Sequence, residues 1–205
     1  MLLTRTPTVL TGVMLVAEQG ERRRVTVILI TGIQAAGKSS VAQAVAERLD
    51  RSVHLRGDVF RKMIVNGRAR MGPTDPPDEA VRQLRLRYRL AAQSADGYAG
   101  AGFTVVLQDI VLGGYLTEMV AMIRTRPLYV VVLAPRPAVV AEREAARHLT
   151  RGKTAYQPDD EDPAELDGHL RRETPRIGLW LDTSDQTLEQ TTDELLTRVW
   201  TEGRV

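Results

Sequence analysis

Short apolar runs alternate along this chain with longer stretches in which apolar residues recur every three or four positions. Runs rich in β-branched residues are typical of strands buried on both faces of a parallel sheet, and the recurring pattern is typical of amphipathic helices. The runs predict strands at residues 25–30, 52–56, 103–109, 128–133 and 177–181. The other stretches predict helices at residues 39–49, 58–65, 78–98, 115–124, 137–148, 164–173 and 188–199.

This alternation of strand and helix predicts an α/β fold. We expect a five-stranded parallel sheet with right-handed crossovers, helices on both faces and a small helical lid. Ligands of such sheets bind at the carboxyl ends of the strands, so the chemistry is expected there. Neither an internal repeat nor a second domain is visible, and residues 25–205 are predicted to form one domain.

Residues 1–24 differ from the rest of the chain and are predicted to be an N-terminal extension of unknown role. Their apolar run, residues 9–17, is too short to span a bilayer. The acidic stretch at residues 18–21 follows where a signal peptide would carry small residues, so a signal peptide is disfavoured. An extension, an added strand or an early start codon are the alternatives. We expect a soluble, cytoplasmic protein with no membrane partner.

The amino-acid composition excludes or disfavours several kinds of functional site. The 205 residues include no cysteine, which excludes disulfides, zinc–cysteine sites, iron–sulfur clusters and cysteine nucleophiles. The three histidines have no metal-ligand spacing. The net charge is only +2 and aromatic residues make up 4%, so neither a concentrated basic face nor a base-stacking platform is indicated. Nucleic acid is therefore not expected as a partner.

The strongest motif lies directly after the first predicted strand. Residues 32–39 read Gly-Ile-Gln-Ala-Ala-Gly-Lys-Ser, a complete Walker A pattern that also opens the next helix. Glycines let the backbone N–H groups turn toward phosphate oxygens, and the helix start adds its positive dipole end. Lys38 is expected at the β- and γ-phosphates and the Ser39 hydroxyl on Mg²⁺. The predicted nucleotide-binding residues are Gly32, Gln34, Ala35, Ala36, Gly37, Lys38, Ser39 and Ser40.

Asp58 follows the second predicted strand. A carboxylate there can orient a substrate hydroxyl and accept its proton during attack on phosphorus. Arg61 lies one helical turn later and could hold an anionic substrate group or the transferring phosphoryl group. The alternative is that Asp58 caps the helix and that Arg61 is solvated.

Asp109 closes the third predicted strand, in a Walker B arrangement. It would hold Mg²⁺ beside Ser39, directly or through water. The alternative is a cap, or a pair with a structural arginine.

Further cations are candidates for a lid. Arg143 and Arg147 lie one turn apart on the helix that begins near Pro137, and a lid cation can neutralise charge on a transferring phosphoryl group. Ordinary ion pairs with Glu142 and Glu144 are the alternative. A separate stripe, formed by Arg82, Arg85 and Arg89, is expected to be an exposed, solvated face, and the alternative is a patch for an anionic substrate.

Together these motifs resemble the chloramphenicol phosphotransferase-like P-loop kinases. The resemblance rests on the Walker A loop, on Gly57-Asp58-Val59-Phe60-Arg61, on residues 107–114 and on the arginines of residues 141–147, and it covers about residues 25–200. It implies a five-stranded kinase-like core, use of ATP and Mg²⁺, and phosphorylation of a small-molecule hydroxyl. It also implies that Asp58 is the general base and that Arg143 or Arg147 is a lid cation. The chain departs from that group at Gln108 and across residues 63–90, which leaves the acceptor open.

The sequence thus predicts an ATP-dependent phosphotransferase that acts on a small-molecule hydroxyl, either an antibiotic or a metabolite. Two alternatives stay open, a zeta-toxin-like kinase of nucleotide sugars and an ATP-binding regulatory protein with weak hydrolysis. The base preference and the oligomeric state are not predicted.

Overall fold

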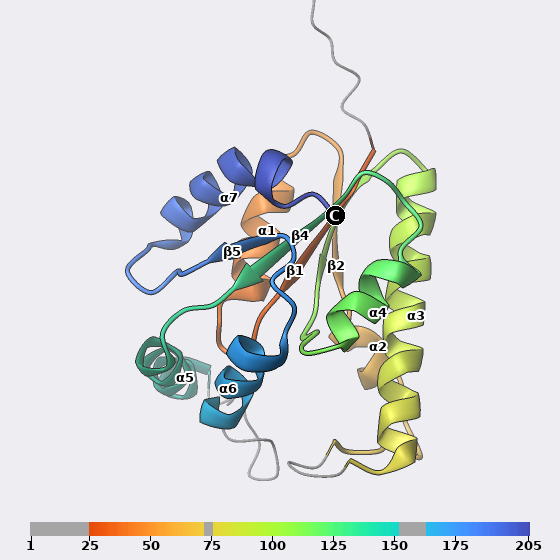
Figure 1. The fold of residues 1–205 in the computed structure, drawn as a ribbon, viewed down its shortest axis with the longest axis vertical. Helices are drawn as coiled ribbons and strands as arrows, with labels where there is room; N and C mark the ends of the chain where they lie inside the picture. Colours follow the sequence, from red (N-terminus) through yellow and green to blue (C-terminus); the bar gives the residue numbers. More distant parts are fainter. Residues whose placement is uncertain (1–24, 72–75, 152–162) are drawn as a thin grey trace, which may run out of the picture.

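A computed structural model describes residues 25–71, 76–151 and 163–205. Its centre is a five-stranded parallel sheet with the strand order β2-β3-β1-β4-β5 (Figure 1). The strands are β1 (Val27–Thr31), β2 (Ser52–Arg56), β3 (Thr104–Gln108), β4 (Leu128–Leu133) and β5 (Leu179–Leu181). The predicted α/β fold with a parallel sheet is confirmed. The predicted extension, residues 1–24, lies outside the described residues.

Helices cover both faces of the sheet. In Figure 1, α1 (Lys38–Glu47) and α7 (Leu188–Glu202) lie on one face, and α3 (Asp78–Gly100) and α4 (Tyr115–Met122) lie on the other. The remaining helices lie toward the carboxyl ends of the strands: α2 (Asp58–Lys62), α5 (Pro137–Arg151) and α6 (Pro163–Glu173). The last two lie where a small helical lid was predicted.

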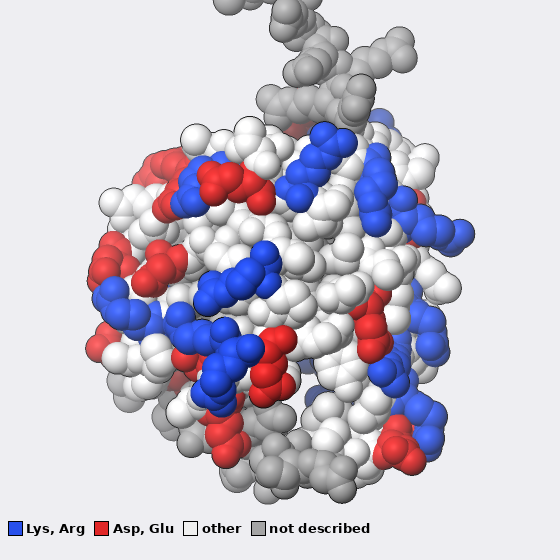
Figure 2. Space-filling view, viewed as in Figure 1, with Lys and Arg blue, Asp and Glu red and all other residues white. Residues whose placement is uncertain are grey.

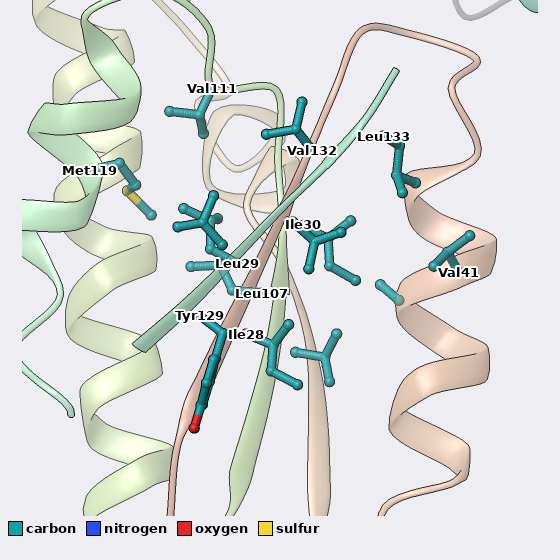
Figure 3. Close-up of a cluster of buried hydrophobic side chains, with 14 of the residues drawn as sticks. Ile28, Leu29, Ile30, Val41, Leu107, Val111, Met119, Tyr129, Val132 and Leu133 are labelled. Carbon is teal, nitrogen blue, oxygen red and sulfur yellow. The ribbon is translucent and has the colours of Figure 1, made fainter. Parts of the chain in front are cut away.

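The core lies on both sides of β1, which is buried along its whole length. Successive side chains of a strand point to opposite faces. Ile28 and Ile30 accordingly point toward the side of α1 and its Val41, while Leu29 points toward the side of α4 and its Met119 (Figure 3). Burial on both faces explains why the strands read as continuous apolar runs.

Element boundaries differ from the predictions at a few places. Helix α3 passes through Gly97 and ends at Gly100, because buried Ala91, Ala95 and Ala99 hold that turn against the sheet. Strand β5 begins only at Leu179, since Gly178 has a left-handed φ of 72° and lies against the carbonyl of Val130. These are adjustments at helix and strand ends.

Charges are mixed over the surface. On the face shown in Figure 2, acidic side chains lie among the basic ones. In the described part of the chain, no helix is long and apolar enough to cross a membrane.

Candidate active site

The Walker A residues form a tight loop between β1 and α1. Gly32 and Gly37 have φ values of 145° and 96°, and Ala35 also lies in the left-handed region at 56°. A side chain on Gly32 would meet the carbonyl oxygen of Leu133 at 2.5 Å. The loop therefore curls tightly against the end of β4, as a phosphate cradle requires.

The start of α1 is left open for an anion. Gly37 occupies the N-cap position, no side chain caps the helix, and its first turn has no acidic residue. Nζ of Lys38, a largely buried side chain, donates a hydrogen bond to the carbonyl of Ile33 at 2.6 Å. Ser39 and Ser40 are exposed. The backbone N–H groups of this helix start and the two hydroxyls are thus available to phosphate oxygens, with the Lys38 ammonium beside them.

Arg143 lies over this loop. Its Nη2 donates to the carbonyl of Thr183 at 2.7 Å, and its Nη1 lies 3.4 Å from the carbonyl of Ala36. A cavity of about 320 Å³ opens beside it and is lined by residues that include Gly37, Ser40, Arg143, Thr183, Gln186 and Leu188. The predicted lid cation Arg143 therefore reaches the loop. The side chain of Arg147, one turn further along α5, lies outside the described part of the structure.

Asp58 is the first residue of α2, at the carboxyl end of β2. Gly57, rather than Asp58, is the N-cap residue, and no side chain caps this helix. The half-buried carboxylate pairs with Lys62 and with Nε of Arg56, the latter at 3.5 Å. Burial alone would raise the pKa of Asp58, but the hydrogen bond from Lys62 and the charges of nearby cations outweigh it and hold that pKa below its ordinary value. Asp58 is therefore ionised at neutral pH.

Asp109 is almost fully buried and is bonded to Arg87 of α3. Nε of Arg87 donates to Oδ2 of Asp109 at 2.7 Å, and its Nη2 pairs with Oδ1. The backbone N–H of Ile110 also donates to Oδ1, at 2.8 Å. A side chain on Gly57 would overlap this carboxylate, so the glycine before Asp58 makes room for Asp109. The alternative of a pair with a structural arginine describes this geometry.

Arg87 is a buried cation beside a second cation. Burial lowers the pKa of its guanidinium, Tyr88 and Asp58 raise it, and the charge of Arg61 lowers it further. The pair with Asp109 compensates for the burial of the charge, since a buried ion is tolerated only when it is paired and hydrogen-bonded. Asp58, Arg61, Arg87 and Asp109 therefore form one charged cluster at the ends of β2 and β3.

The two predicted metal ligands fit Mg²⁺ unequally. The exposed hydroxyl of Ser39 at the start of α1 suits an ion that also binds phosphates. Both oxygens of Asp109, by contrast, are occupied by Arg87 and the N–H of Ile110, so direct ligation would break this buried pair. The residues that the structure describes contain no cluster of three or more acidic or histidine side chains suited to a metal.

Sequence reasoning missed Arg87 and singled out its neighbours on α3. Two of those neighbours make exposed ion pairs, Arg82 with Glu79 and Arg85 with Glu118, as expected of a solvated face. Its place in the helical pattern could have identified Arg87. It recurs at helical spacing with Leu84 and Ala91, on the side of α3 that packs inward.

Helix α6 closes against the loop after β3. A side chain on Gly113 would meet Nε2 of His169 at 2.7 Å, and the N–H of Gly113 donates to Oγ1 of Thr174 at 2.8 Å. What the structure shows at Gly113 is close approach of α6.

Comparison with known protein families identifies the family of this chain. A family model described as an AAA domain matches residues 27–172, more than half of the sequence. The chain belongs to the AAA domain family. Within this AAA domain, the match includes the Walker A loop, Asp58, Arg87, Asp109 and Arg143. It ends before β5 and α7, and the connection between these two elements supplies Thr183 and Gln186 to the cavity. No curated protein sequence matches this AAA domain significantly.

Solved structures share the fold of this AAA domain at low sequence identity. A sugar kinase from Janibacter sp. HTCC2649 is 18% identical, with a TM-score of 0.63 over 84% of this chain and 93% of that one. A gluconokinase from Sinorhizobium meliloti 1021 is 21% identical, with a TM-score of 0.54 over 85% and 91%. The Mycobacterium tuberculosis APS kinase in complex with AMPPNP and APS is 18% identical, with a TM-score of 0.56 over 85% and 96%. The AAA domain thus has a P-loop kinase-like fold.

Proposed function

We propose that this protein transfers the γ-phosphate of ATP to a hydroxyl group of a small molecule. The observation that carries the proposal is Asp58, an ionised carboxylate at the carboxyl end of β2, on the same edge of the sheet as the phosphate loop. A positioned base beside a phosphate cradle is what hydroxyl phosphorylation requires.

In the proposed step, the acceptor oxygen attacks the γ-phosphorus while the bond between that phosphorus and the β,γ-bridging oxygen breaks. The proton of the acceptor hydroxyl passes to Asp58, and ADP leaves. Lys38 stabilises the charge on the β- and γ-phosphates, and Arg143, with Arg147 as a second candidate, neutralises the phosphoryl group from the lid side. Most of the acceleration comes from positioning and charge neutralisation.

Mg²⁺ held at Ser39 would supply further neutralisation of phosphate charge. Asp109 is proposed to act there through water, because its own oxygens are bonded to Arg87 and Ile110. The cavity beside Arg143 is the proposed place of the nucleotide base, between the phosphate loop and Gln186.

The comparisons support a kinase-like protein without naming an acceptor. The solved relatives are described as kinases of a sugar, of gluconate and of APS, and their identities below 25% support the fold alone. The chloramphenicol phosphotransferase-like subgroup is the finer part of this proposal, and the motifs quoted for it are its only support.

The test is incubation of the purified protein with ATP, Mg²⁺ and a library of metabolites and antibiotics, followed by mass spectrometry. We expect an acceptor that gains one phosphoryl group. Asp58→Asn should reduce transfer by about 100-fold or more and leave ATP affinity unchanged. Asp193→Asn, a change at an exposed carboxylate of α7, is the matched control.

Slow release of phosphate from ATP with no phosphorylated acceptor would contradict the proposal and favour an ATP-binding regulatory protein. Toxicity on expression that Lys38→Ala suppresses would favour the zeta-toxin-like kinase instead.

A further inference from the structure

We infer that Gln108 is a further catalytic residue, whose side-chain amide donates a hydrogen bond to the γ-phosphate of ATP during transfer. This inference rests on the proposed function, because it concerns the phosphoryl group that moves toward Asp58. Gln108 is the last residue of β3 and directly precedes Asp109. Three features of Gln108 support this role: its free amide, the face of the sheet on which it lies, and its place between the two sides of the site.

Gln108 is a buried polar residue whose side chain is unused. It is only 4% exposed, and its amide makes no hydrogen bond to any residue in the part of the chain that the structure describes. The fully enclosed side-chain atoms that lack a partner in that part of the chain do not include this amide, so it borders open space. An amide can donate and accept hydrogen bonds, and a buried amide that makes none destabilises the folded protein. A ligand that accepts a hydrogen bond from Gln108 would remove this cost.

The side chain of Gln108 lies on the face of the sheet that α1 covers. Gln108 is in register with Ile30 of β1, and register partners in a parallel sheet point to the same face. Ile30 points toward the side of α1 (Figure 3), and α1 packs against β3. Since a helix that follows a parallel strand begins at the carboxyl end of the sheet, the end of β3 faces the first turn of α1, with Lys38 and Ser39.

Asp109, the next residue, extends toward the other face. Its carboxylate pairs with Arg87 of α3, a helix that lies on the opposite side of the sheet from α1. A neutral amide suits a direct contact with phosphate, because its NH2 group donates to phosphate oxygens, whereas a carboxylate repels them unless a cation lies between. Mg²⁺ prefers carboxylates, phosphates and water as ligands. The amide of Gln108 is therefore assigned to the phosphate.

The order of the strands places Gln108 between the two sides of the site. In the order β2-β3-β1, strand β1 leads into the phosphate loop and β2 leads to Asp58. A phosphoryl group that moves from the loop to a hydroxyl at Asp58 therefore crosses the end of β3. The carbonyl of Gln108 also accepts a hydrogen bond from the N–H of Gly57 at 2.9 Å, which fixes this end of β3 to the residue before Asp58. A donor on a rigid strand can stabilise charge on the moving group without reorganisation.

Nucleotide affinity tests the contact directly. AMPPNP carries a γ-phosphate and ADP does not, so a contact with that group affects only AMPPNP. Gln108→Met keeps the approximate size of the side chain and removes the donor. With saturating Mg²⁺, this change should weaken AMPPNP binding by about 10-fold in calorimetry and leave ADP affinity unchanged. Gln93→Met, at an exposed glutamine of α3, is the matched control.

Urea unfolding of the nucleotide-free protein separates this role from a structural one. Gln108→Met removes an unpaired buried amide, so the unfolding midpoint should stay the same or rise. A glutamine that stabilised the fold would instead lower the midpoint when replaced, and the binding of both nucleotides would weaken together. A lower midpoint with equal losses of AMPPNP and ADP affinity would overturn the inference.

A charged variant distinguishes phosphate from Mg²⁺ as the partner. Gln108→Glu places a carboxylate of nearly the same shape at the site and should weaken AMPPNP binding more than Gln108→Met does, because the carboxylate repels the phosphate. If the amide bound Mg²⁺, Gln108→Glu would lower the Mg²⁺ concentration that AMPPNP binding requires, and this result would overturn the inference. Gln93→Glu is the control. Should Gln108→Glu fail to fold, the methionine variant still decides the question.

Transfer to an acceptor gives the kinetic form of the test. Gln108→Met should lower kcat by about 10-fold to 100-fold and change the KM of the acceptor little, because the contact is made with the moving phosphoryl group. Unchanged kcat and AMPPNP affinity in an enzyme that phosphorylates its acceptor would overturn the inference and leave the proposed function intact. A selective loss of AMPPNP affinity without any phosphorylated acceptor would support the contact and contradict the proposed function. Failure of the wild type to bind AMPPNP would contradict both.

Discussion

The nucleotide side and the acceptor side of the candidate site are built in different ways. The nucleotide side is one continuous loop, residues 32–40, whose ligand groups are backbone N–H groups, one ammonium and two hydroxyls. The proposed acceptor side is assembled from α2, α3 and the end of β3, and its polar groups are charged side chains that pair with one another. The helix start at the phosphate loop can bind an anion directly. The charged side chains of the other side are already paired with one another.

This difference separates two requirements of phosphoryl transfer. Binding the triphosphate requires a fixed geometry that a short motif can encode, because every triphosphate has the same shape. Binding the acceptor requires a shape and charge that depend on the substrate. The pair of Arg87 with Asp109 shows how the second side is held in place by contacts between residues far apart in the sequence.

The largest effect is expected from breaking that pair. Asp109→Leu leaves the buried Arg87 without its carboxylate, which should cost about 3–5 kcal/mol of unfolding free energy. The double change Arg87→Met with Asp109→Leu removes both charges and should recover most of that loss. Urea unfolding of the wild type, the two single variants and the double variant measures the coupling.

A different result would indicate that Asp109 binds Mg²⁺ directly. If Asp109 bound Mg²⁺ directly, Asp109→Asn would change stability little and would greatly raise the Mg²⁺ concentration that transfer requires. We expect the opposite order, with Ser39→Ala raising the Mg²⁺ requirement more than Asp109→Asn does.

Lys38→Ala tests the nucleotide side. It should reduce kcat/KM by about 100-fold to 1,000-fold, because the ammonium stabilises charge on the phosphates. It should also weaken AMPPNP binding, whereas Asp58→Asn should not. The two variants therefore separate the two sides of the site by calorimetry. Equal AMPPNP affinities for both variants would show that Lys38 does not contact the phosphates.

The fold and the nucleotide side could be predicted because their information is local. Each strand was a continuous apolar run, and the Walker A residues are contiguous, so neither needed knowledge of distant contacts. The helix at residues 78–98 was predicted two residues too short, because the packing of Ala99 outweighs the low helix propensity of Gly97 and Gly100.

The acceptor side could be predicted only in part. Asp58 and Arg61 follow a strand end and could be selected from their position, but the partner of Asp109 lies 22 residues before it on another element. Side-chain pairing between elements leaves little local trace, and Arg87 stood among four arginines on one helix with nothing but helical phase to distinguish it. Gly57 likewise gains its meaning only from the carboxylate that lies against it.

Gly57→Ala tests that close approach. The added methyl group would overlap the carboxylate of Asp109, so either the pair with Arg87 or the start of α2 must shift. We expect a loss of about 1–3 kcal/mol in unfolding free energy together with lower transfer activity. Gly97→Ala is the matched control: it lies inside α3 with no atom within 4 Å of the added methyl, and should stabilise by up to about 1 kcal/mol. Similar effects of the two changes would contradict the packing argument.

The smallest expected effect concerns the charge balance at Asp58. Burial raises the pKa of Asp58, but the hydrogen bond and charge of Lys62, with Arg56 and Arg87, bring it below its ordinary value. A lowered folded-state pKa means that the ionised form contributes stability above the unfolded-state pKa, and that this contribution is lost as the pH falls through the folded-state pKa. The same ionised form is the proposed base, so transfer should fall on the acid side. Lys62→Met removes the lowering interaction and should move the acid limb of kcat/KM to higher pH. The shift should be small because Lys62 is an exposed partner, and exposed ion pairs are worth no more than about 1 kcal/mol.

Arg82→Gln is the control and should leave the pH profile of kcat/KM unchanged. If Lys62→Met does not move the acid limb, a group other than Asp58 accepts the proton.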